Sequence, residues 1–466
     1  MPDSQLSPAS ASLPATAPSA LPERAELDRL VGMILDEARR LGATESEAAV
    51  SFSDGLSVSV RLGEVETLEY QRDRGLGVTV YFGRRKGSAS TSDWREPALL
   101  ETVRAACDIA RYTAEDPWSG LADPARLARA PLPELDLHHP WALSAEQAID
   151  IARDCEAAAR GFDARISNSD GASVGRHESL VVYGNSNGFL GGYPSTRHSL
   201  SCSVIAADPQ ADGRMERDYW YTSDRDASRL EAPDAVGRRA AERVLRRLGA
   251  RRIGTRTAPV LFVPELARGL VGHFLGAIRG GALYRKSSFL LDRAGTAVFP
   301  DFMQIHERPH LPRALGSAAF DGEGVATQDR DLVCDGVLQG YVLDSYSARR
   351  LGLETTGNAG GVHNVIVGSS APAVGYDELL AAMGTGLVVT ELMGHGVNAV
   401  TGDYSRGAAG FWVENGEPVH PVEEITIAGN LKTMFETLQM IGSDIDLRGN
   451  VRCGSMLLAP MTIAGA

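Results

Sequence analysis

The sequence from residue 383 to residue 416, MGTGLVVTELMGHGVNAVTGDYSRGAAGFWVENG, is rich in glycine and in strand-forming residues. The pair Asn415-Gly416 follows the apolar run Phe411-Trp412-Val413, and Asn-Gly is a preferred centre of a two-residue β-hairpin turn. Pro418 cannot donate a ladder hydrogen bond, so we expect it on an edge strand. Because the chain after residue 254 keeps this composition, residues 255–466 are predicted to form a Gly-rich, β-dominated C-terminal domain.

The preceding part of the chain alternates between helical and strand patterns. Apolar residues at three- and four-residue spacing predict a helix from Leu27 to Leu41, and further helices fit Glu96–Ala114 and the segment that a capping box opens at Ser144. Between residues 56 and 82 three short alternating segments predict antiparallel strands: Leu56–Leu62, Val65–Tyr70 and Val78–Phe82. Residues 24–254 are therefore predicted to form an α+β domain with a mostly antiparallel sheet, preceded by a Ser/Pro/Ala-rich disordered tail over residues 1–23.

Composition excludes several classes of function. The chain has 466 residues and a formal net charge of -14, which argues against a nucleic-acid partner. The Arg-rich run 238–252 is interpreted as an amphipathic helix with Val244, Leu245 and Leu248 inward and its arginines in solvent. No apolar run is long enough to span a bilayer, and the N-terminus lacks the features of a signal peptide. We therefore expect a cytoplasmic protein without a membrane partner.

Two short motifs match catalytic signatures but lack the required context. His306-Glu307-Arg308-Pro309-His310 fits the H-E-x-x-H pattern of zinc peptidases, but Pro309 is incompatible with the helix that must place both histidines on one face. We expect a surface loop there. Gly184-Asn185-Ser186-Asn187-Gly188 fits the nucleophile elbow of hydrolases, but two glycines and a proline follow it where a helix is needed. We expect a turn between strands.

Several longer strings carry a resemblance to a known family. They are MERDYWY (215–221), GGALYRKSSFLLD (280–292), SYSARRLGLETTGNAGG (345–361), the quoted stretch 383–416, and EITIAGNL (424–431). Over about residue 25 to the C-terminus the chain resembles the TldD/PmbA metallopeptidase family. Within it, the chain is similar to the PmbA-type (TldE-like) subunit, which also carries the older label "modulator of DNA gyrase".

The resemblance implies a degenerate metal site. Catalytic TldD members carry His-Glu-x-x-x-His on a helix and a C-terminal Cys; the two His and the Cys bind zinc, and the Glu is the general base. Here Arg268 stands at the first His and Gly269 at the Glu, while His273 and Cys453 match the second His and the Cys. A guanidinium stays protonated, so it cannot replace a zinc ligand. We expect no catalytic residues, no metal and no cofactor in this chain, with His273 and Cys453 as packing residues.

The resemblance also implies a substrate-binding segment. The Gly-rich loop expected over Gly402–Gly410 corresponds to a region that takes peptide substrate in the family. Small residues would let an extended peptide pair with the edge of the following strand. The candidate contacts are Tyr404, Gly407, Ala408 and Gly410. The open alternative is a rigid, tightly turned loop within a barrel-like C-terminal domain.

The expected function follows from this resemblance. The chain would be the non-catalytic subunit of a TldD/TldE-type zinc metallopeptidase complex that degrades or matures small unfolded peptides. Its partner in a heterodimer would be a TldD-type paralogue that holds the zinc, and whether the chain alone forms a homodimer is left open. One alternative is a self-sufficient metallopeptidase that adds a third ligand, His395 or Glu391, to His273 and Cys453. Another alternative, from a different class, is a regulator that binds DNA gyrase.

Overall fold

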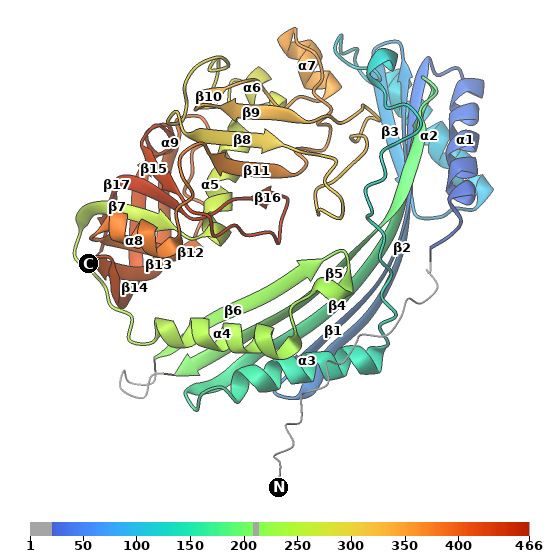
Figure 1. Cartoon of the computed structure of the whole chain (residues 1–466). Coiled ribbons are helices and arrows are strands. Elements are labelled where there is room, and N and C mark those ends of the chain that lie inside the picture. The colour runs from blue at the N-terminus through green and yellow to red at the C-terminus, as the bar shows by residue number, and fades with distance from the viewer. Residues whose placement is uncertain (1–20, 208–213, 466) are drawn as a thin grey trace.

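The computed structural model describes residues 21–207 and 214–465. Most of the tail expected over residues 1–23, namely residues 1–20, lies outside the described residues. The first helix, α1, spans Arg24–Arg40 and ends before Gly42, as its apolar spacing predicted. Helices and strands combine in an α+β arrangement, which confirms the expected fold class (Figure 1).

A curved antiparallel sheet of six long strands forms the N-terminal half. Its order is β3-β2-β1-β4-β5-β6, and every neighbouring pair is antiparallel. The strands are β1 (Glu45–Arg61), β2 (Glu64–Phe82), β3 (Arg85–Thr91), β4 (Ile166–Asn185), β5 (Leu190–Ala207) and β6 (Met215–Asp224). The expectation of separate strands at Val65–Tyr70 and Val78–Phe82 was wrong, because β2 pairs along the whole length of β1 and needs no turn between them.

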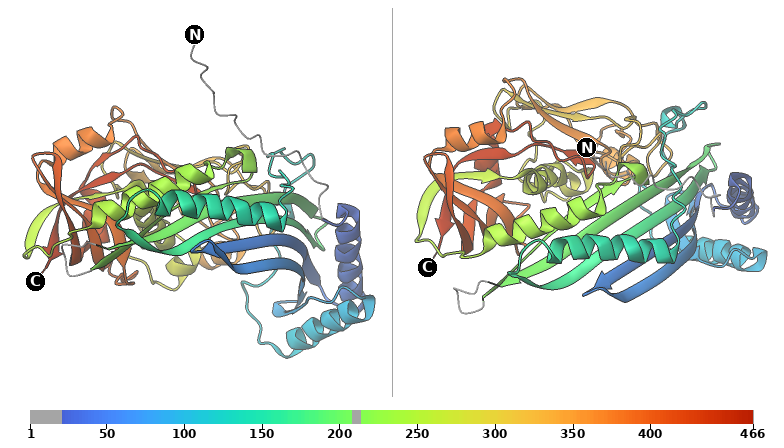
Figure 2. Two further views of the ribbon diagram at one scale, coloured as in Figure 1. Left: turned by 90° about the horizontal axis from the view of Figure 1, so that it is seen from below. Right: turned by 60° about the horizontal axis from the view of Figure 1, so that its bottom comes forward.

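Four helices cover the convex face of this sheet, while its concave face lies toward the C-terminal half (Figures 1 and 2). At one end α1 and α2 (Glu96–Tyr112) bury Ile34 and Val103 against Val50 and Val78. At the other end α3 (Ala145–Arg160) and α4 (Pro233–Arg247) form a second core on β1, β4 and β5. The predicted capping box between Ser144 and Gln147 is present at the start of α3.

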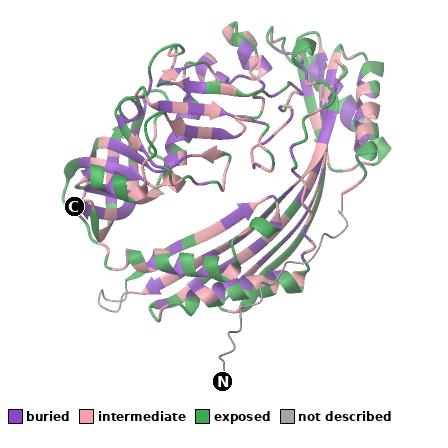
Figure 3. Cartoon of the chain, in the orientation of Figure 1, coloured by how far each residue is buried: buried purple, intermediate pink, exposed green. Residues whose placement is uncertain are grey.

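The C-terminal half is built on a closed five-stranded barrel. Strands follow one another in the order β14-β13-β12-β7-β17, and pairing of β14 with β17 closes the ring. Its strands are β7 (Arg256–Phe262), β12 (Gly386–Met393), β13 (Asp403–Glu414), β14 (Glu417–Asn430) and β17 (Met456–Ala464), with β15 (Leu438–Ile441) added to β17. Many residues of the barrel strands are buried (Figure 3), and helices α5 (Pro264–Ala277), α8 (Tyr376–Met383) and α9 (Leu431–Glu436) pack with the barrel.

A smaller sheet lies beside the barrel. It has the order β10-β9-β8-β11-β16. The strands are β8 (Met303–Glu307), β9 (Arg330–Cys334), β10 (Val337–Leu338), β11 (Val365–Ser369) and β16 (Val451–Arg452), and the short helices are α6 (Gly280–Tyr284) and α7 (Ser345–Leu351). Two 3₁₀ turns, Pro124–Arg126 and Ala227–Arg229, complete the described elements.

The turns predicted from Asn-Gly pairs are confirmed. Asn187-Gly188 lies between β4 and β5, where Gly188 has a φ of 90°, so the apparent nucleophile elbow is a hairpin turn. Asn415 and Gly416 both have positive φ and connect β13 to β14. Pro418 lies in β14 opposite Val413. Across the described ranges, no helix is both long enough and apolar enough to cross a bilayer.

Helices α3 and α4 approach each other so closely that one contact requires glycine. A Cβ atom on Gly237 in α4 would lie 2.1 Å from the carbonyl oxygen of Cys155 in α3. This carbonyl oxygen cannot move away without disrupting α3. The glycine therefore sets the distance between the two helices.

We predict that Gly237→Ala destabilises the protein by roughly 1–3 kcal/mol through overpacking. The matched control is Gly32→Ala in α1, where no atom lies within 4 Å of the new methyl group. Alanine should stabilise that helix by about 0.5–1 kcal/mol. Urea unfolding of both variants measures the difference, and a Gly237→Ala protein as stable as the control variant would refute the contact.

Candidate functional site

Helix α5 carries the first candidate residues. Gly269, Gly272 and Gly276 are exposed, and no atom lies within 4 Å of the position that a Cβ would take on any of them. The helical spacing places His273 on the same face. The opposite face packs into the barrel core through Leu270, Val271 and Phe274. This face of α5 is therefore exposed, and His273 contributes the only side chain larger than hydrogen among these four residues.

Arg268 is held in place by polar groups on two sides. Its Nη1 atom donates a hydrogen bond to the Tyr221 hydroxyl at 3.1 Å and lies 3.5 Å from Oδ2 of Asp446. Burial alone would raise the pKa of Asp446, but hydrogen bonds from Arg448 and the charges of Arg448 and Arg268 lower it overall. Asp446 is therefore ionised, and it neutralises Arg268.

The other two candidate residues, Cys453 and His273, lie apart from any third donor within the described residues. Cys453 is fully buried, its Sγ atom lies 3.8 Å from the carbonyl oxygen of Pro264, and burial raises its pKa to about 12. The thiol thus keeps its proton at neutral pH and packs as a small apolar group. The ring of His273 contacts the ring of Tyr404 edge to face at 6.1 Å between centroids. Burial, and then the charge of Arg406, lower the pKa of His273.

Neither proposed third ligand completes a donor set. Glu391, on β12, forms an ion pair with Arg247 at 2.6 Å, and His395 is exposed in the following loop. Among residues 21–207 and 214–465, no group of three or more His, Cys, Asp or Glu side chains could hold a metal ion. The side chains of His273, Cys453, Glu391 and His395 therefore do not form the donor set that a zinc ion needs.

The segment expected to be a substrate loop is instead a barrel strand. Residues 403–414 form β13, which pairs with β12 on one side and β14 on the other: Gly407 faces Met393 and Thr426, and Ala408 faces Leu392 and Ile425. Tyr404 and Ala408 are buried in the core, Gly410 is buried, and Gly407 is half-buried. The expected loop with a free edge was wrong, because both edges of the strand are already occupied.

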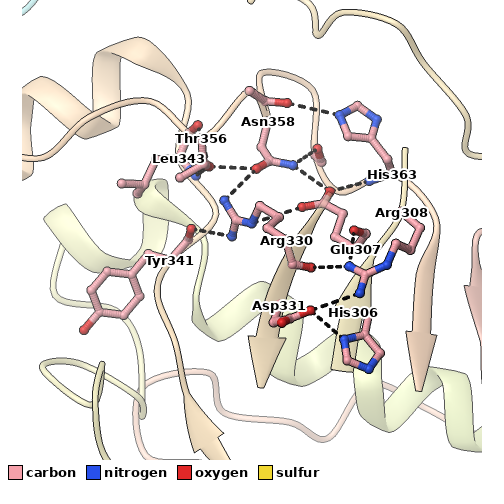
Figure 4. Close-up of polar contacts among 12 residues, drawn as sticks. His306, Glu307, Arg308, Arg330, Asp331, Tyr341, Leu343, Thr356, Asn358 and His363 are labelled. Carbon is pink, nitrogen blue, oxygen red and sulfur yellow. Dashed lines mark hydrogen bonds and ion pairs between the residues drawn. The ribbon is translucent and has the colours of Figure 1, made fainter. Parts of the chain in front are cut away.

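The H-E-x-x-H match also lies on a strand. His306 and Glu307 belong to β8, which confirms that the segment is not helical, but the expected surface loop was wrong for Glu307, which is 1% exposed. Figure 4 shows its partners: Oε1 accepts hydrogen bonds from Asn358 and from the His363 backbone, each at 2.8 Å. Arg330 lies 3.3 Å from the other oxygen. This network joins two strands to a loop and has no open position for a substrate.

The sequence interpretation misplaced two arginines of the Arg-rich helix. Val244 is buried as predicted, but Arg243 and Arg247 in α4 are not in solvent. Arg243 donates to Asp218 at 3.1 Å and to Glu265 at 3.3 Å, and Arg247 lies 2.6 Å from Glu391. The acidic partners come from β6, α5 and β12, so α4 connects the N-terminal sheet to the barrel.

These elements enclose a cavity of about 250 Å³ beside Arg268. Its aromatic wall comes from β6: the guanidinium of Arg448 lies 3.8 Å from the centroid of Trp220, and Tyr219 stacks on Tyr221 at 6.3 Å. Tyr219 is 54% exposed. In the string MERDYWY (215–221) three charged residues precede three aromatic ones, and this local pattern is the sequence signal that could have indicated the site. The arrangement can bind peptide side chains of either charge as well as aromatic ones.

The position of Ala408 changes what a substitution there should do. We predict that Ala408→Glu destabilises the barrel by several kcal/mol, because it places an unpaired carboxylate in an apolar interior. Ser405→Glu on the same strand is the control, since Ser405 is exposed and should change stability by no more than about 0.5 kcal/mol. Thermal unfolding distinguishes the two. An Ala408→Glu protein as stable as the control would show that this strand is open to solvent.

Comparison with known proteins agrees with this architecture. Family models for the PmbA/TldA metallopeptidase match as domain 1 over residues 46–110, the central domain over 138–248 and the C-terminal domain over 255–465. Metalloprotease PmbA of Escherichia coli O157:H7 is 53% identical over 420 residues, which cover 90% of this chain and 92% of that protein.

Solved structures share the fold over nearly the whole chain. A Bacteroides thetaiotaomicron protein labelled a modulator of DNA gyrase is 30% identical, with a TM-score of 0.89 over 95% of this chain and 99% of that one. TldE of Thermococcus kodakarensis is 19% identical, with a TM-score of 0.81 over 94% of this chain and all of that one, and so shares the fold alone. This chain therefore belongs to the PmbA/TldD family of metallopeptidases.

Proposed function

We propose that this chain is a non-catalytic subunit that acts in proteolysis together with a TldD-type paralogue. The observation that carries the proposal is the state of the degenerate site. Arg268, which stands where a zinc ligand is expected, donates to Tyr221 and is neutralised by Asp446. Gly269 offers no general base, and the Cys453 thiol is buried with a pKa of about 12. The partner would supply the zinc, the ligands and the base.

The proposed substrates are small unfolded peptides. Their entry past this subunit would follow the cavity beside Arg268, since β13 has no free edge to offer them. Two main-chain groups of β6 at this cavity already have side-chain partners: the Tyr219 N–H donates to Asp218 at 2.7 Å, and the Tyr221 carbonyl accepts from Arg448 at 3.1 Å. A peptide would therefore contact mainly the aromatic and charged side chains there.

The other two functions considered have less support. A self-sufficient metallopeptidase needs a third donor near His273 and Cys453, and Glu391 is already paired with Arg247. A regulator of DNA gyrase is suggested by the labels of solved relatives, but no feature of the described residues points to a gyrase-binding surface.

The proposal predicts activity only in the presence of a partner. The purified chain should contain well under one zinc ion per chain after dialysis, and it should not cleave casein or an unfolded peptide. Addition of a TldD-type paralogue should start cleavage that a chelator abolishes. Elemental analysis and a peptide-release assay measure both quantities. Chelator-sensitive cleavage by the isolated chain, lost in His273→Ala, would establish the self-sufficient enzyme instead.

The cavity makes a separate prediction about substrate binding. Tyr219→Ala should raise the KM of the mixed complex roughly three- to tenfold, because an aromatic contact contributes about 0.5–1.5 kcal/mol beyond its buried area. The value of kcat should stay nearly constant, since the reacting groups lie in the partner. Tyr112→Ala on α2 is the control, because Tyr112 is 92% exposed and remote from the cavity. Equal KM values for the two variants would place the peptide path elsewhere.

A further inference from the structure

A cavity of about 530 Å³ lies at a second junction between the two halves of the molecule. It shares no lining residue with the cavity beside Arg268. Its walls come from β1, β2, β3 and α2 of the N-terminal half, and from α7 and the loop at Glu323 of the C-terminal half (Figure 1). Cavities of this size between two domains are common binding sites for small molecules.

Hydrogen bonds between the two halves hold the walls of this cavity. Arg349 of α7 donates to the carbonyl oxygens of Trp118 at 2.9 Å and Gly120 at 3.0 Å. The Tyr346 hydroxyl donates to Asp116 at 2.8 Å. The loop over residues 116–121 is therefore fixed against α7, so the shape of the cavity does not depend on a ligand.

One wall carries a carboxylate that two tyrosines orient. The Tyr183 hydroxyl donates to one oxygen of Glu47 at 2.7 Å, and the Tyr81 hydroxyl donates to the other at 3.2 Å. Both tyrosines are buried. Among residues 21–207 and 214–465, neither Glu47 nor Glu323 forms an ion pair. The direction of the Glu47 carboxylate is thus fixed, while its charge has no cationic partner.

Glu323 lines the same cavity from the C-terminal half. Its Oε2 atom accepts a hydrogen bond from the Ser345 backbone N–H at 3.0 Å. Burial raises the pKa of Glu323 to about 7, and the charges of Asp321 and Asp344 add to this effect, although hydrogen bonds from Ser345 oppose it. A nearby cation would lower this pKa, and a bound ammonium group would supply one.

The opposite charge is present on β3. Lys86 lines the cavity, and its Nζ atom lies 6.0 Å from the centroid of the Tyr81 ring. Within the described ranges Lys86 forms no ion pair either. Tyr81 therefore lies beside both an unpaired ammonium group and the Glu47 carboxylate that its hydroxyl binds.

The lining of the cavity adds apolar surface to these charges. Ile109 of α2 and Leu121 contribute large apolar side chains. An adjoining cavity of about 460 Å³ shares Glu47 and Glu323, so there is room beyond both carboxylates. A ligand that carries an ammonium group, a carboxylate group and an apolar side chain would match these charges and this surface.

We propose that this cavity binds a small zwitterion with an apolar side chain, as a free amino acid or a dipeptide provides. Its ammonium group pairs with Glu47 and Glu323, and its carboxylate group pairs with Lys86. This binding concerns the chain alone and does not rest on the function proposed above.

The first test titrates the full chain with L-leucine and with alanyl-leucine in a calorimeter. At least one of the two should bind, and the tighter of them distinguishes a free amino acid from a dipeptide. The N-acetylated and the amidated derivatives of that ligand should each bind at least tenfold more weakly, because each loses one charged contact. No binding of either ligand, or equal binding of the blocked derivatives, would overturn the proposal.

The second test repeats the titration with variants of the cavity. Glu47→Gln and Lys86→Gln should each weaken binding at least tenfold, whereas Glu64→Gln, at an exposed residue of β2 outside the cavity, should bind as the wild type does. Lys86 is exposed, so its variant should fold even if Glu47→Gln does not, and thermal unfolding checks both. Wild-type affinity in a folded Lys86→Gln protein would contradict the assigned carboxylate contact and overturn the proposal.

Discussion

Charges that leave water must be paired, and this requirement fixes how the N-terminal sheet meets the barrel. An unpaired buried charge costs several kcal/mol, whereas a paired and hydrogen-bonded one costs far less. Arg243 and Arg247 on α4 find their partners in Glu265 of α5 and Glu391 of β12. Arg268 of α5 reaches back to Tyr221 of β6. Each half contributes arginines that bind partners in the other half. A rotation of one half relative to the other would therefore leave at least one of these guanidinium groups without its partner.

The same network explains how the site keeps its charge balance around Arg268. Asp446 accepts hydrogen bonds from Arg448 and lies 3.5 Å from Arg268, so two guanidinium groups flank one carboxylate. Arg448 also lies over the ring of Trp220. Both guanidinium groups are therefore held by partners within this network.

Local sequence rules predicted some of the elements, whereas others depend on contacts between residues that are distant in the sequence. The spacing of Leu27, Leu30 and Ile34, the cap at Ser144 and the Asn415-Gly416 turn are properties of a few neighbouring residues, so they could be predicted. The environment of Arg247 could not, because Glu391 lies far away in the sequence. The same holds for Glu307, whose burial depends on Asn358 and Arg330. Of the candidate site, the positions on α5 could be identified from the sequence, whereas the cavity required three distant elements to be placed together.

The closure of the barrel by its last strand has a consequence for the order in which the chain folds. The sheet needs nothing beyond β6 and α4, which end at Arg247, but β7 pairs with β12 and β17, whose residues follow it by more than a hundred positions. Such distant pairings form slowly because long loops must close first. During synthesis the sheet can therefore fold on the ribosome before either strand that pairs with β7 has been made. Until these strands emerge, β7 has no strand partner, and unpaired strands with apolar side chains are the segments of a nascent chain most prone to aggregate.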